Sequence, residues 1–101
     1  MDIIKRVENG QYHLQLLGKF TFADNKMFRE IINELTPPTI KRVVFDMEKL
    51  EFVDSAALGM LLLAHDETLK HKKGPIILQK PEGQVKKMFS IARFDQYFQI
   101  V

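Results

Sequence analysis

Four acidic side chains lie close together in the middle of the chain, directly before a serine. Asp46 and Glu48 follow a short apolar run, and Glu51 and Asp54 lead into Ser55. Ligands of open α/β sheets often bind at strand ends, so this cluster suggests acid–base chemistry. Such chemistry needs a partner group held in a pocket, and no histidine is near in the sequence. We therefore expect a protein that is not an enzyme.

Other common types of site have no matching pattern. His13, His65 and His71 show neither the spacing of metal ligands nor that of a catalytic triad, and the chain has no cysteine. The glycines are scattered and form no phosphate-binding loop. We expect no metal and no cofactor. The basic run at residues 70–73 follows a predicted helix, where cations stabilise the helix dipole, so it is interpreted as a solvated helix end.

Ser55 stands where a helix is predicted to begin, at about Ala56. Its hydroxyl would be exposed to solvent beside free backbone N–H groups, which favour an anion. Serine is also a preferred N-cap residue, so position alone favours a simple cap. A phosphoryl group adds about −1.5 to −2 charges, which a helix N-terminus tolerates. A partner docked there would then meet a dianion beside Asp54, so the site also has the properties of a phosphorylation switch.

The wider pattern predicts an α/β fold with the element order β-β-α-β-α-β-α-β. We expect a mixed sheet of about five strands, with helices packed mainly on one face. The turn residues Asn9 and Gly10 predict an opening hairpin, and Asp24 is predicted to cap the first helix, which ends before Pro37. The remaining predicted elements are a central strand at 42–47, a helix at about 56–70, a strand at 75–80, a helix opened by Pro81 and Glu82, and a strand at 97–101.

Composition limits the class of protein. The chain has 101 residues, of which 46% are hydrophobic, so we expect a single domain over residues 1–101. The longest apolar stretch, residues 56–64, is far shorter than the roughly 20 residues that span a membrane. The formal charge of +2 gives no reason to expect a nucleic acid partner. The lack of cysteine suits a reducing compartment, and we expect a cytoplasmic protein.

The segment VVFDMEKLEFVDSAALGMLL, residues 43–62, resembles the signature of STAS domains, and specifically of bacterial anti-sigma factor antagonists. The likeness extends from LLGKF at residues 16–20 to KPEGQVKKMFSIARFDQYFQI at residues 80–100. The resemblance implies the STAS fold and makes Ser55 the residue phosphorylated by a serine kinase of the GHKL type, often itself the anti-sigma factor. A PP2C-like phosphatase would reverse the modification. Asp54 would shape the acceptor loop, and Gly59 would permit close approach of a partner.

The resemblance also implies a partner-binding surface, which would comprise Thr21, Phe22, Asp54, Ser55, Ala56 and Gly59. Thr21 stands where the family commonly has an acid that helps recognise the partner kinase. Ala56 and Ala57 replace a Ser-Gly pair, which gives a stiffer helix start and leaves no second hydroxyl. The chain ends without the last helix that many members carry, so we expect a sheet edge or face to be open to a partner.

Together, residues and resemblance predict a phosphorylation-controlled binding module that regulates transcription in bacterial signal transduction. It would engage its partner when unmodified and release it when Ser55 is phosphorylated. The partner would be an anti-sigma factor or serine kinase, or a response regulator that carries kinase and phosphatase domains. One alternative is a constitutive STAS scaffold subunit of an ABC-type lipid transport complex, which docks on an ATPase and is never phosphorylated. A second alternative is an enzyme that depends on Asp46.

Overall fold

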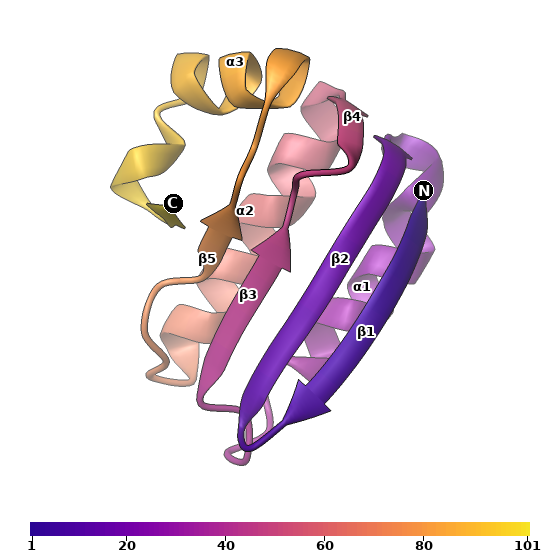
Figure 1. The fold of residues 1–101 in the computed structure, drawn as a ribbon. Coiled ribbons are helices and arrows are strands. Elements are labelled where there is room, and N and C mark those ends of the chain that lie inside the picture. Colours follow the sequence, from indigo (N-terminus) through magenta and orange to yellow (C-terminus); the bar gives the residue numbers. More distant parts are fainter.

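Five strands form the main path of a mixed sheet in the order β1-β2-β3-β5-β6, and a sixth strand, β4, pairs with β2 (Figure 1). The computed structural model describes all residues, 1–101. Only β1 and β2 are antiparallel, and every other pair is parallel. The elements in chain order are β1 Asp2–Glu8, β2 Gln11–Phe20, the 3-10 helix η1 Phe22–Asp24, α1 Asn25–Glu34, β3 Arg42–Asp46, β4 Leu50–Val53, α2 Ser55–Lys70, β5 Ile77–Gln79, α3 Gly83–Ile91, the 3-10 helix η2 Phe94–Gln96 and β6 Gln99–Ile100.

The opening hairpin turns at the two residues that the sequence indicated. Asn9 and Gly10 both have positive φ, at 50° and 80°, as a two-residue turn between twisted antiparallel strands requires. The register runs from Asp2 opposite Leu17 to Glu8 opposite Gln11. The predicted hairpin is therefore confirmed.

The sheet has one face covered by helices. Tyr12, Leu14 and Leu16 of β2 are buried, whereas the alternate residues His13 and Gln15 are only half-buried. Helices α1 and α2 lie side by side behind the sheet in Figure 1, and α3 lies across its upper end. This confirms the expected α/β fold with helices mainly on one face.

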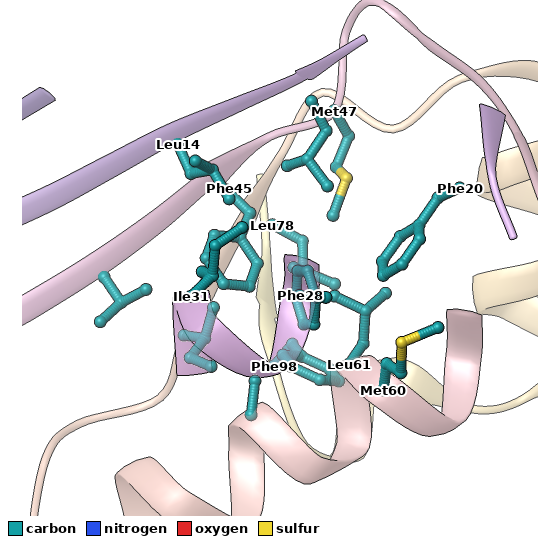
Figure 2. Packing of buried hydrophobic residues seen from close by; sticks show 14 of the residues in the cluster. Leu14, Phe20, Phe28, Ile31, Phe45, Met47, Met60, Leu61, Leu78 and Phe98 are labelled. Carbon is teal, nitrogen blue, oxygen red and sulfur yellow. The ribbon is translucent and has the colours of Figure 1, made fainter. Parts of the chain in front are cut away.

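The core between the sheet and the helices is rich in phenylalanine. Phe28 of α1 packs at ring-centroid distances of 4.8 Å from Phe20 and 5.8 Å from Phe45. Figure 2 shows Phe28 in the middle of this cluster, with Leu61 of α2 beside it. Because Phe20 is the last residue of β2, this packing fixes where the chain leaves the sheet and enters η1.

Strand β4 was not predicted, because the alternation of buried and exposed residues breaks down there. Leu50 and Val53 are both buried although they are three residues apart. The pairing of β4 with β2 shifts in register between Gly18 and Lys19, so two β4 residues, Glu51 and Phe52, occupy the space of one. Phe52 is therefore left partly exposed.

The predicted role of Asp24 was wrong in detail. Asp24 occupies the N-cap position of α1 as predicted, but its side chain makes no capping bond to that helix. Its Oδ2 instead accepts the backbone N–H of Thr21 at 2.9 Å, while the Thr21 hydroxyl accepts the N–H of Ala23 at 3.4 Å. The two side chains thus form a capping box at η1, the short helix that connects β2 to α1.

Candidate functional site

Asp54 is the N-cap of α2, and both of its carboxylate oxygens are used. Oδ1 accepts the backbone N–H of Ala57 at 2.8 Å, which satisfies one of the free donors of the helix start. Oδ2 accepts the N–H of Phe22 at 3.1 Å. The same side chain therefore caps α2 and attaches it to the segment that follows β2.

Ser55 is the first residue of α2, one position earlier than the predicted helix start at Ala56. The interpretation of Ser55 as a simple cap is wrong, because Asp54 performs that role. The Ser55 side chain is exposed, and its hydroxyl makes no hydrogen bond within the protein. A free hydroxyl thus stands at the end of a 16-residue helix where the backbone dipole favours negative charge.

Two exposed aromatic rings belong to the segments beside this helix start. Phe22, whose N–H contacts Asp54, is 67% exposed, and Phe52, two residues before Asp54, is 37% exposed. Phe22 was among the predicted partner-binding residues, whereas Phe52 was not. No periodic signal marked Phe52, because its exposure results from the register shift in β4.

The other predicted surface residues differ in their exposure. Thr21 and Ala56 are half-buried, and Gly59 is exposed. Gly59 lies one helical turn after Ser55, so both residues face the same side of α2. Apart from its chain neighbours and the backbone of its own helix, a Cβ atom built on Gly59 meets no atom within 4 Å. The packing of this chain therefore does not require a glycine there.

The acidic cluster does not form a pocket. Asp46 accepts the N–H of Glu48 at 3.0 Å in the turn after β3, and Glu48 and Glu51 are exposed. None of the cavities on the protein surface is lined by Asp46, Glu48, Glu51 or Asp54. The side chains of Asp46 and Asp54 thus stabilise a turn and a helix start, respectively.

The basic end of α2 also has a structural role. Lys73 donates from Nζ to the carbonyl oxygens of Pro37 at 3.0 Å and Ile40 at 2.6 Å. The Nδ1 atom of His71 lies 2.9 Å from the carbonyl oxygen of Glu67 in the last turn. The His71 contact agrees with the interpretation as a helix end, whereas Lys73 is half-buried and binds the loop before β3, so that part of the run is not solvated. No helix has both the length and the apolar content needed to cross a membrane.

Comparison with known proteins identifies the family. The STAS domain model matches residues 2–101. The chain belongs to the STAS domain family. A STAS-domain containing protein of Pseudomonas aeruginosa (strain UCBPP-PA14) is 34% identical over 87 residues, which cover 86% of this chain and 84% of that protein.

Solved structures share this STAS fold at low sequence identity. The anti-sigma factor antagonist SpoIIAA in its unphosphorylated form has a TM-score of 0.78 and 19% identity, covering 99% of this chain and 87% of that chain. The phosphorylated form of Bacillus SpoIIAA has a TM-score of 0.76 at the same identity, covering 99% and 91%. A putative anti-sigma factor antagonist from Thermotoga maritima has a TM-score of 0.85 and 15% identity, covering 97% and 84%. At these identities the likeness shows a common fold.

Proposed function

We propose that this STAS domain is a phosphorylation-controlled binding module that acts in the manner of an anti-sigma factor antagonist. It binds its partner when Ser55 is unmodified and releases it when Ser55 carries a phosphoryl group. The observation that carries the proposal is the exposed, unbonded hydroxyl of Ser55 at the first residue of α2, next to a separate cap. Because Asp54 already caps the helix, Ser55 is available for modification.

The fold is expected to tolerate the phosphoryl group. A negative charge at a helix N-terminus stabilises by about 0.3 to 1 kcal/mol, and the repulsion from Asp54 opposes part of this gain. The side chain is exposed, so a phosphoryl group displaces no core residue. Likeness to structures of SpoIIAA in both its unphosphorylated and its phosphorylated form supports this expectation.

The same modification is expected to weaken a complex strongly. The exposed side chains of Phe22 and Phe52 and the bare backbone at Gly59 offer an apolar surface beside Ser55. A partner that covers this surface would have to desolvate a dianion beside the Asp54 carboxylate. Disruption of a buried interface contact costs about 2 to 5 kcal/mol. That cost weakens binding about 30-fold to several thousand-fold.

The family resemblance supplies the class of partner. A serine kinase of the GHKL type, itself an anti-sigma factor or part of a response regulator, would bind and phosphorylate the domain. A PP2C-like phosphatase would restore the binding form. The domain itself performs no catalysis in this scheme, and it acts in the cytoplasm on the regulation of transcription.

Two variants of Ser55 test the switch. Ser55→Ala is used as bait to capture the partner from native extract, and calorimetry then compares its affinity with that of Ser55→Glu. We expect the glutamate variant to bind at least 10-fold more weakly. Ser90→Glu, which alters an exposed serine on α3, is the matched control and should bind like wild type. Equal affinities of the two Ser55 variants would rule out the switch.

The alternative role as a constitutive scaffold of an ABC-type lipid transport complex uses the same exposed helix start. It differs in one measurable property, because it needs no phosphate. Mass spectrometry of the protein isolated from native cells in several growth phases separates the two. Phosphate on Ser55 in any phase supports the switch, and its absence in all phases supports the scaffold.

A further inference from the structure

Strand β4 has a strand neighbour on one edge only. It pairs with β2 through Gly18, Lys19 and Phe20. The strand next to β3, β5, ends at Gln79, where it pairs with Asp46, so it does not reach β4. After Gln79 the chain turns through Lys80, at φ 54°, and enters α3. The outer edge of β4 therefore faces a helix instead of a strand.

The side chain of Gln84, in the first turn of α3, takes the place of the missing strand. Its Oε1 accepts the backbone N–H of Val53 at 2.9 Å, and its Nε2 donates to the carbonyl oxygen of Val53 at 2.8 Å. Two residues that exchange both hydrogen bonds in this way are typical of an antiparallel ladder. The amide group satisfies both backbone groups of a buried residue, which would otherwise lose hydrogen bonding.

Val53 is followed directly by Asp54 and Ser55, so this contact lies close to the proposed switch. The side chain of Val53 is buried in the core, and its backbone is hydrogen-bonded to Gln84. The next residue, Asp54, donates its N–H to the carbonyl oxygen of Phe20 at 3.3 Å and caps α2. The chain leading to Ser55 is thus held from both sides, by β2 on one edge and by α3 on the other.

We infer that Gln84 is a positioning residue for the start of α2. Its amide group fixes the backbone at Val53, and through it the orientation of Asp54 and the place of Ser55. Movement of α3 would consequently alter the presentation of Ser55. The regulatory meaning of this coupling rests on the proposed function, whereas the positioning itself does not.

Amide hydrogen exchange of the free, ¹⁵N-labelled chain tests the inference without kinase or partner. Gln84→Met removes both hydrogen bonds and keeps a side chain of similar length and helix propensity. We expect exchange at Val53 to accelerate on the order of 10-fold. The amide resonances of Ser55 and Ala57 should shift. The amides of Leu14 and Phe45, in the middle of the sheet, should exchange as in wild type.

The matched control is Gln96→Met, which makes the same chemical change at an exposed glutamine of η2. It should leave Val53, Ser55 and Ala57 unchanged. Unaltered exchange at Val53 in the Gln84 variant would overturn the inference. An equal acceleration of all amides would also overturn it, because that result indicates a general loss of stability. Failure of the Ser55 variants to differ in partner affinity would refute the switch and leave this result standing.

Discussion

The Asp54 carboxylate accepts the backbone N–H of Phe22 at 3.1 Å, and so joins two segments that lie 32 residues apart in the chain. Its other oxygen caps α2. This double contact holds the start of α2 beside η1 and leaves the Ser55 hydroxyl free. The arrangement separates the residue that stabilises the helix end from the residue proposed to be modified.

Replacement of Asp54 should destabilise the fold. Asp54→Ala removes the helix cap and the bond to Phe22, and we expect the free energy of unfolding to fall by about 2 kcal/mol. Asp54→Asn keeps one acceptor oxygen and should lose about half as much. Urea denaturation measures both. Asp95→Ala, at an exposed surface ion pair with Arg93, should change stability by less than about 0.5 kcal/mol. An Asp54→Ala variant as stable as this control would contradict the double contact.

Loss of the Phe22 ring should affect binding and not folding. Because Phe22 is 67% exposed, Phe22→Ser should change the free energy of unfolding by less than about 0.5 kcal/mol. Partner affinity, measured by calorimetry, should fall about 30-fold, as for an aromatic residue within an interface. Ile91→Ser is the control, since Ile91 is 68% exposed on α3. If both variants bind equally well, Phe22 lies outside the partner surface.

Gly59→Ala should stabilise the folded chain. Gly59 is helical and exposed with free space around it, so alanine should add about 0.5 to 1 kcal/mol to the free energy of unfolding. Under the proposed function, the added methyl group should weaken partner binding. Gly83→Ala is the contrasting variant, because Gly83 has φ +56° and alanine there should destabilise by about 1 kcal/mol. A loss of stability in Gly59→Ala would show that the glycine is required by the fold.

A hydrogen bond between Tyr12 and Glu34 should make stability depend on pH. The Tyr12 hydroxyl donates to Oε1 of Glu34 at 2.6 Å, and Lys5 donates to the same oxygen at 3.0 Å. The bond from Tyr12 lowers the pKa of Glu34. Burial, followed by the bond to Glu34, raises the pKa of Tyr12 above its ordinary value of 10.0.

The sign of each effect follows from proton linkage. The lowered pKa of Glu34 contributes stability above its ordinary value of 4.5, and this stability is lost as the pH falls below that value. The raised pKa of Tyr12 contributes stability below pH of about 10, which is lost as the pH rises above it. Tyr12→Phe should lower the free energy of unfolding by about 1 kcal/mol at pH 7. When the free energy of unfolding from urea denaturation is plotted against pH, the variant should show a smaller loss at both the acidic and the alkaline end. Tyr97→Phe, at an exposed tyrosine, should keep the wild-type profile. A Tyr12→Phe profile parallel to wild type from pH 3 to 11 would refute the coupling.

Local patterns were enough to predict most of the fold. Asn9 and Gly10 tolerate positive φ, so they marked the hairpin, and Pro37 marked the end of the first helical region. The apolar run at β3 indicated a strand in the middle of the sheet. These features depend on the conformational preferences of a few neighbouring residues, so they can be predicted from the local sequence.

Other features depend on residues that are distant in the chain. Strand β4 is four residues long and carries a register shift, so no alternation revealed it. In the sequence, Gln84 looks like an ordinary residue of a helix. Its role arises only because α3 packs against the free edge of β4 at Val53, which lies 31 residues earlier in the chain. The acidic residues near β4 were apparent in the sequence as a group. Whether they form a pocket depends on the directions of their side chains, which the turn after β3 and strand β4 set.

The sequence by itself determined that an acid and a serine meet at the start of a buried helix. Both side chains are good caps, so local preferences could not assign the role to either. Only the tertiary structure decided it. The second carboxylate oxygen of Asp54 finds the N–H of Phe22, and a single hydroxyl could not bridge the two segments as this carboxylate does. The helix consequently begins at Ser55 and leaves that hydroxyl in solvent.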